Sequence, residues 1–480
     1  MIRLTLLWLF VAGLAAYAFK DWFRSLCGLI LLLAVVEHPD FPKTIMGIQG
    51  LNPWNLLLFM IVIAWADARR KEGLKFDMPK AVVWLLGIYF SIIFIAFVRF
   101  VFFPDMYFEY LELVQKEMPS IFNKGSEYII NCFKWVVPGI LLYDGCRDEK
   151  RTKLALYTIV TVYVLLAIQV IRWVPLGYLR SGDELQARAL KIIANEVGFH
   201  RVNISMMLAG ASWALFCARD MIQRPIFRHM LLLGCCITFF GMALTGGRMG
   251  YVTWAVLGFM FSVLRWRRLL LLGPAVVAMF ILMVPAVQER FVAGFTPDTV
   301  DTNLRLTEMG YQDGDGPDLY TVTSGRAFAW PFVIEEIAQK PLIGYGREAM
   351  LRTGLGVRIW RQYGESFPHP HNAYLQWLHD NGILGFIPVM TFYILAMWMA
   401  MRLFMNKDDA TCRAVGGVAL ALTGSLLIAA MGSQTFYPRE GSMPMWCALG
   451  LTLRCYVLRT SWLESRQPLQ SHGRHLSPVT

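Results

Sequence analysis

The chain has 480 residues, of which 56% are hydrophobic and only 16% are charged. Soluble domains are typically about 45–50% apolar and about 25% charged, so this composition excludes an ordinary soluble domain of this length. The net charge of +11 is typical of the basic loops that orient a membrane protein, and we therefore do not expect a nucleic-acid partner.

Apolar blocks recur along the whole chain and are separated by short charged stretches. About 20 apolar residues cross the hydrocarbon core of a bilayer, and only structures with closed hydrogen bonding persist there, so each block is predicted to be a helix. The first block has no small-residue cleavage site after it and is predicted to be a retained span. The sequence predicts an all-α, polytopic membrane protein of about 11–13 spans. The spans are residues 3–19, 25–37 (short enough to be re-entrant), 51–66, 81–103, 128–144, 154–171, 202–217, 229–245, 249–264, 269–286, 382–404, 414–431 and 441–458.

Lysine and arginine gather in every second loop from the third span onward. Short basic loops remain in the cytoplasm, so the loops between them are predicted to lie outside, including the long segment 287–381. The basic loops are 69–75, 147–153, 219–228, 265–268 and 402–413.

The long outer segment is predicted to carry short helices. Residues 325–339 form one, with Ser324 as its N-cap, and it ends before Pro341. A second helix runs from about Asn372 to Asp380, with Gly382 as its C-terminal cap, and the next span begins at once.

Two outward-facing motifs carry arginine. Leu244-Thr-Gly-Gly-Arg248 is a tight turn between spans, and Arg248 is either functional or an interfacial anchor. Ser324-Gly-Arg326 precedes Trp330 by one helical turn. Arginine suits planar recognition of phosphate, although Arg326 alone could equally be a surface charge.

A third motif, Phe367-Pro-His-Pro-His371-Asn372-Ala-Tyr374, is rich in histidine, which can accept a proton near neutral pH. The spacing of His369 and His371 does not suit zinc, so no metal is expected. A structural role for the histidine is the alternative. A fourth motif, the acidic stretch 313–318, lacks the glutamate of a calcium loop and is interpreted as a solvated turn.

Together these motifs place cations and an imidazole on one face of a membrane bundle. A polyprenyl pyrophosphate would suit such a face, because its tail needs the bilayer and its headgroup needs arginines.

The same motifs resemble the O-antigen ligase and O-antigen polymerase superfamily of membrane glycosyltransferases, most strongly over about 240–390. The most specific match is the stretch 369–376 followed by Gly382-Ile-Leu-Gly385. The turn ending at Arg248 and the stretches 324–330 and 341–346 match more loosely, and Gly247 stands where the family often has serine.

The resemblance implies transfer of a glycan from undecaprenyl pyrophosphate to an acceptor hydroxyl, with inversion and without metal or another cofactor. By the same resemblance, Arg248 and Arg326 would bind the pyrophosphate and His371 would be the catalytic residue. Supporting or glycan-binding roles fall to Asn372, Tyr374 and Trp330. Arg201, at an outer helix start, would bind glycan or phosphate, or would anchor that helix at the lipid headgroups.

The implied location is the bacterial inner membrane, with the active face periplasmic and with membrane lipids, a lipid-linked donor and a glycan or lipid acceptor as partners. The predicted parts are an N-terminal transmembrane bundle (1–286), a periplasmic loop with the catalytic helix (287–381), C-terminal transmembrane helices (382–460) and a cytoplasmic tail (461–480). A ligase and a polymerase both remain open, with the large aromatic outer loop favouring a polymerase slightly. A transporter of polysaccharide or a small anion is the alternative function, disfavoured because the charges lie at the span ends.

Overall fold

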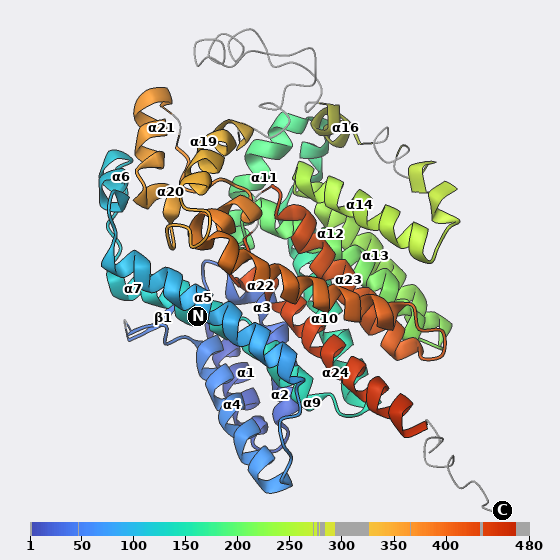
Figure 1. Cartoon of the computed structure of the whole chain (residues 1–480). Coiled ribbons are helices and arrows are strands. Elements are labelled where there is room, and N and C mark those ends of the chain that lie inside the picture. The colour runs from blue at the N-terminus through green and yellow to red at the C-terminus, as the bar shows by residue number, and fades with distance from the viewer. Residues whose placement is uncertain are drawn as a thin grey trace, which may run out of the picture.

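The computed structural model describes residues 2–46, 48–271, 273–275, 278, 284–292, 326–364, 366–432 and 435–466. These residues are almost entirely helical, and their only sheet is a short hairpin in which β1 (Thr44–Ile45) pairs antiparallel with β2 (Ile48–Gln49). The predicted all-α class is therefore confirmed (Figure 1).

The first half of the chain contributes α1 (Ile2–Ala18), α2 (Trp22–Leu31), α3 (Leu33–Val36), α4 (Pro53–Glu72), α5 (Lys80–Phe102), α6 (Tyr107–Leu113), α7 (Ile121–Gly125), the π-helical η1 (Ser126–Ile130), α8 (Asn131–Lys134), α9 (Val137–Gly145), α10 (Glu149–Trp173), the 3-10 helix η2 (Leu176–Arg180), α11 (Gly182–Glu196) and α12 (Arg201–Ala218). The second half contributes the 3-10 helix η3 (Arg219–Met221), α13 (Pro225–Leu244), α14 (Arg248–Leu264), α16 (Pro285–Val292), α19 (Arg326–Gln339), α20 (Ala349–Arg352), α21 (Leu355–Tyr363), α22 (Ala373–Phe404), α23 (Ala410–Ala429), the 3-10 helix η4 (Glu440–Ser442) and α24 (Met443–Arg466).

Six helices of the described chain are long and apolar enough to cross a membrane, namely α5, α10, α12 with η3, α13, α22 and α23. Shorter apolar helices cover the predicted spans at α1, α2 with α3, and α14. The protein is thus a multi-pass membrane protein. The predicted second span is interrupted at Leu32, where α2 ends and α3 begins. Within the predicted span 269–286, residues 272, 276–277 and 279–283 lie outside the described residues.

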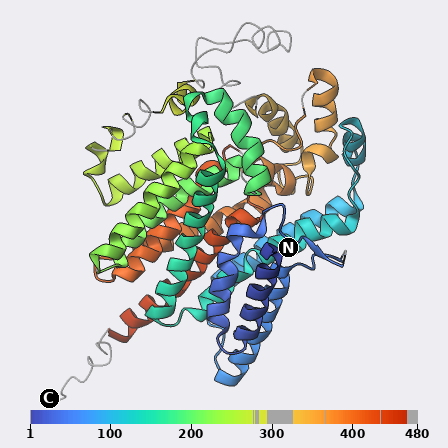
Figure 2. The ribbon, with the colours of Figure 1, turned by 180° about the vertical axis from the view of Figure 1, so that it is seen from behind.

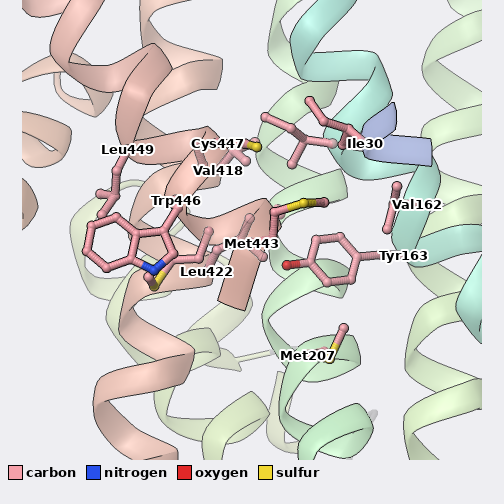
Figure 3. Packing of buried hydrophobic residues seen from close by; sticks show 14 of the residues in the cluster. Ile30, Val162, Tyr163, Met207, Val418, Leu422, Met443, Trp446, Cys447 and Leu449 are labelled. Atoms are coloured by element: carbon pink, nitrogen blue, oxygen red, sulfur yellow. The ribbon is translucent and has the colours of Figure 1, made fainter. Parts of the chain in front are cut away.

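The centre of the bundle is formed by α12 and α23, which pack against each other and are the most deeply buried of the long helices. Figure 3 shows part of this core, where Met443 of α24 lies beside Tyr163 of α10. The Trp446 ring of α24 points to the other side and stacks on Phe392 of α22, with ring centres 5.5 Å apart. The helix α24 also crosses α9 with the two backbones in contact, because Gly139 and Gly450 face each other there and a Cβ on Gly450 would overlap the Gly139 carbonyl. Such small residues let membrane helices approach closely.

All five basic loops gather at one end of the bundle and are joined by polar contacts. These contacts are Arg413 Nε to Asp220 Oδ2 (3.1 Å), Arg265 Nε to Asp220 Oδ2 (3.6 Å), Thr411 Oγ1 to Glu149 Oε1 (3.1 Å) and Arg147 Nη2 to the Lys75 carbonyl (3.2 Å). The helices α6, α19, α20 and α21 gather at the opposite end, as Figures 1 and 2 both show. The bundle therefore has one basic end and one end that carries the short helices of the outer loops.

The outer loops contain more helix than the sequence predicts. The 15-residue α11 and the short helices α6, α7, α20 and α21 are absent from the prediction. These helices pack against segments that are far away in the chain. For example, α11 packs against α16, and the Gly182 amide donates to Glu289 Oε2 at 2.6 Å. A pattern within one segment does not reveal such partners.

Candidate active site

The chain reverses direction immediately before α22. His371 has a φ of 52°, in the left-handed region that histidine visits more often than most residues with a side chain. The next residue, Asn372, caps the helix, since its Oδ1 accepts the amides of Tyr374 (3.0 Å) and Leu375 (3.2 Å). A side-chain cap of this kind satisfies amides that the first helical turn leaves without partners. The predicted helix start at Asn372 is confirmed.

The first turn of α22 is fixed against the end of α23. The Ala373 amide donates to the Ala430 carbonyl at 2.7 Å, and the Tyr374 hydroxyl donates to the Leu427 carbonyl at 2.8 Å. The Tyr374 ring also packs edge-on against Phe436, with ring centres 5.0 Å apart. Tyr374 therefore holds the helix start in place.

The three histidines of the motif divide into a pair and a single residue. The rings of His369 and His371 are half-buried and lie with their centres 4.1 Å apart, so the two imidazoles face each other. His379 is only 1% exposed, and its Nε2 lies 2.8 Å from Glu336 Oε2. That contact links α19 to α22 and gives His379 a structural role.

The helix α19 is attached directly to the histidine motif. The Trp330 indole donates to the Pro370 carbonyl at 2.9 Å, which brings the helix against the residue just before His371. Arg326 is the first residue of α19, one turn before Trp330, and the helix matches the predicted range 325–339 almost completely. The Arg326 side chain and all of Ser324 lie outside the described residues.

The turn before α14 is packed too tightly for side chains. Gly246 has a φ of 63°, a conformation that favours glycine. A Cβ on Gly247 would lie 2.7 Å from Ser205 Oγ, and Ser205 donates to the Gly247 carbonyl at 3.3 Å. This contact with α12 explains why glycine occupies position 247, and it leaves Arg248 as the first residue of α14.

The structure brings Arg201 to the same turn, since its Nη1 donates to the Gly246 carbonyl at 3.4 Å. This turn and the histidine motif both border the end of α23. A Cβ on Gly432 would lie 3.0 Å from Met249 Sδ, next to Arg248, while Ala430 accepts the Ala373 amide. Residues 430–432 thus separate the arginine turn from the helix that follows His371.

Behind the histidine helix lies a buried polar network that the sequence did not indicate. The Arg347 guanidinium carbon lies 3.5 Å from the centre of the Tyr437 ring, and Nη1 lies 4.0 Å from Asp380 Oδ2. Asp380 also accepts the Ala349 amide (3.1 Å) and the Tyr437 hydroxyl (2.8 Å). Burial by itself lowers the pKa of Arg347, but Tyr437, Glu348 and other neighbours outweigh burial and raise the pKa, so the guanidinium stays charged. The network joins residues 345–349 to the far end of the histidine helix.

Metal ligands do not gather in the described part of the chain, where no group of three or more His, Cys, Asp or Glu side chains could hold an ion. The acidic stretch 313–318 lies outside the described residues.

In a comparison with protein families, residues 233–390 match the family described as O-antigen ligase. The matched range runs from within α13 to within α22 and includes Arg248, Arg326 and His371. A search of curated proteins gives no match.

Proposed function

We propose that this chain, which belongs to the O-antigen ligase and polymerase superfamily through residues 233–390, transfers a glycan from undecaprenyl pyrophosphate to an acceptor hydroxyl. The observation that carries the proposal is the meeting of two structures at the end of α23. The turn that bears Arg248 and Arg201 lies on one side of residues 430–432, and the helix start after His371 lies on the other. An anion and a hydroxyl could be bound side by side there.

The reaction is a single displacement at the anomeric carbon. The acceptor oxygen forms the new glycosidic bond as the bond between the anomeric carbon and the pyrophosphate oxygen breaks, and the bonding pair leaves with the pyrophosphate. Arg248 and Arg326 stabilise the charge that develops on the leaving group. His371 orients the acceptor hydroxyl and takes its proton, and configuration is inverted because no covalent enzyme intermediate forms.

The remaining residues hold this arrangement. Asn372 and Tyr374 fix the helix start, while Trp330 ties the helix that begins at Arg326 to the peptide before His371. Arg201 adds a second cation to the Arg248 turn and would contact phosphate or glycan. Catalysis needs no metal, because guanidinium groups supply the positive charge.

We place the active end of the bundle in the periplasm and the basic end in the cytoplasm of a bacterial inner membrane. All five basic loops share one end of the bundle, which agrees with the positive-inside rule. On this assignment residues 1–286 and 382–460 are the membrane parts, 287–381 is the periplasmic loop and 461–480 is a cytoplasmic tail.

A labelling experiment tests this orientation. Gln362 is exposed on α21, and Lys150 is exposed at the basic end. A cysteine at position 362 should react with a membrane-impermeant maleimide in intact spheroplasts, whereas a cysteine at 150 should react only after lysis, with the parent chain as background. The reverse pattern would reject the orientation and the active face together.

A transfer assay tests the function itself. Purified protein in detergent, given an undecaprenyl-pyrophosphate-linked glycan, should release the lipid pyrophosphate only when an acceptor is present, and EDTA should not change the rate. Lipid A-core as the productive acceptor would identify a ligase, and a second lipid-linked repeat would identify a polymerase. Absence of transfer with both acceptors, or inhibition by EDTA that magnesium or zinc reverses, would contradict the proposal.

A further inference from the structure

A second polar pocket lies at the same end of the bundle and contains none of the residues assigned above. It has a volume of about 290 Å³, near the lower end of the range of about 300–1,000 Å³ for ligand pockets. Its walls come from three segments, namely the loop and helix start between residues 36 and 55, residues 126–135 of η1 and α8, and Glu440 of η4. The size suits a single sugar unit.

Lys134 is the central cation of this pocket. Its ammonium lies 4.4 Å from the centre of the Trp135 ring and 5.8 Å from that of Trp54, distances that allow cation–π attraction. Among the described residues it has no hydrogen bond or ion pair, although Glu37 and Glu440 are close enough to attract it electrostatically. Its three N–H donors are therefore directed to a ligand or to water.

The charges of the pocket balance. Lys43 lies 3.4 Å from Glu37, and Lys134 and Glu440 also line the pocket, so it holds two ammonium groups and two carboxylates. A phosphate or a uronic acid would meet both carboxylates without a surplus of positive charge. An uncharged ligand with many hydroxyls can instead donate to the carboxylates and accept from the lysines.

Two short stretches of chain connect the pocket with the candidate active site. Glu37 touches Gly198 so closely that a Cβ there would overlap the Glu37 carbonyl, and Gly198 is three residues before Arg201. Glu440 is four residues after Phe436, whose ring packs on Tyr374. The pocket and the candidate active site are therefore built partly from the same segments of the chain.

We infer that the pocket binds one uncharged, hydroxyl-rich sugar residue of the glycan that the active site handles, with Lys134, Asn131 and Glu440 as its hydrogen-bonding groups. This inference rests on the proposed function, because it assumes that a glycan lies at the neighbouring site. It makes the segment between α3 and α4, together with α8, a determinant of sugar specificity.

Direct binding to purified protein tests the inference without any donor substrate. Saturation-transfer NMR would use methyl glycosides of glucose, galactose, rhamnose and N-acetylglucosamine as neutral probes, with glucose 1-phosphate and glucuronic acid as charged comparators. At least one neutral glycoside should bind, and Lys134→Met should weaken it about tenfold or more, the usual effect of losing a hydrogen bond to a charged group. Asn131→Leu and Glu440→Gln should also weaken binding of the glycoside. If Lys134→Met does not fold, these two variants test the inference in its place.

Lys153→Met is the matched control, because Lys153 is also a half-buried lysine but lies at the basic end and is paired with Glu149. This variant should bind the glycoside as well as the parent does. Three outcomes would overturn the inference: no neutral glycoside binds, all variants bind equally well, or the charged probes bind better than the neutral ones. The transfer assay separates the two proposals. If the protein binds a neutral glycoside but transfers no glycan to any acceptor, the pocket inference stands and the proposed function is rejected. If transfer is unchanged in all pocket variants, the proposed function stands and the pocket inference is rejected.

Discussion

Two helices at the active end of the bundle begin in opposite ways. Before α14, Gly246 adopts a φ of 63° and the N-cap is Gly247, with no side chain to bind the helix amides. Before α22, the residue with positive φ is His371, and Asn372 caps the helix with its side chain. The first turn depends on glycines that allow close packing against α12, and the second depends on a side-chain cap at the start of the helix.

The difference indicates how each functional group is held. Around Arg248, close contact between α12 and the glycines sets the backbone, and a long side chain would reach from there to the proposed pyrophosphate. Around His371, the Asn372 cap, the Trp330 indole and the Ala430 carbonyl each fix a neighbouring residue. A proton acceptor needs exact placement, whereas a cation that binds an anion tolerates more freedom, so we expect the two starts to respond differently to mutation.

The largest effect is expected for His371→Ala. Loss of a general base costs about 10²–10⁴-fold in rate, and the transfer assay with equal amounts of inserted protein would measure it. His371→Gln separates two roles, because glutamine can orient a hydroxyl but cannot take its proton at neutral pH. We expect His371→Gln to be nearly as slow as His371→Ala.

His369→Ala is the matched control for that experiment, since its ring packs on His371 but is assigned no proton transfer. Its loss should be clearly smaller than that of His371→Ala. Full turnover by His371→Ala would remove the residue from the mechanism, and equal losses at the two positions would assign the chemistry to the pair of imidazoles.

Arg248→Ala and Arg326→Ala are expected to have the next largest effects. A hydrogen bond to a charged group contributes about 1.5–3 kcal/mol, or roughly 10–150-fold in rate. Lysine should restore only part of the activity, because it cannot bridge two phosphate oxygens. Arg224→Ala, exposed before α13 near the basic end, should transfer normally, and parent activity in either alanine variant would exclude that arginine from the site.

The sequence predicts most of the helices because apolar blocks and basic loops are properties of single segments. The helices at 326–339 and after Asn372 follow from local caps and breakers. Gly382, with a φ of 62°, divides α22 into two helices at the position where the sequence predicts one helix to end and the next span to begin. The helix α11 and the break at Leu32 were missed because their partners lie elsewhere in the chain.

Within the site, local sequence motifs point to individual candidate residues, but they do not predict which of these residues contact one another. Nothing in the sequence shows that Arg201 reaches the Gly246 carbonyl or that His379 pairs with Glu336, because these contacts cross large sequence separations. The pocket around Lys134 was missed for the same reason. A lysine inside an apolar block was the one available signal, since such residues are rare in spans and often functional.

Asn372→Ala should have a moderate effect. Removing an N-cap side chain costs about 0.5–2 kcal/mol, and the loosened turn would release the backbone that orients His371. Transfer should fall several-fold, and Asn372→Ser should recover it, because serine caps about as well as asparagine. Thermal unfolding in detergent measures the stability, and a transfer rate in Asn372→Ala equal to that of the parent would show that the cap does not position the histidine.

The smallest effect on transfer is expected at Gly247, where the change should appear in stability. A serine there, as the family often has, would place its Cβ 2.7 Å from Ser205 Oγ and 2.9 Å from Ser205 Cβ, and overpacking of this kind costs about 1–3 kcal/mol. Gly247→Ser should therefore unfold at a lower temperature than the parent. Ser205→Gly removes the clashing atoms, so the double variant should be more stable than the sum of the two single changes predicts, with a coupling of about 0.5–3 kcal/mol. If the changes in stability of the two single variants add up to that of the double variant, the turn relaxes without resistance from α12. Close packing would then not hold the start of α14, and the contrast with the capped start of α22 would fail.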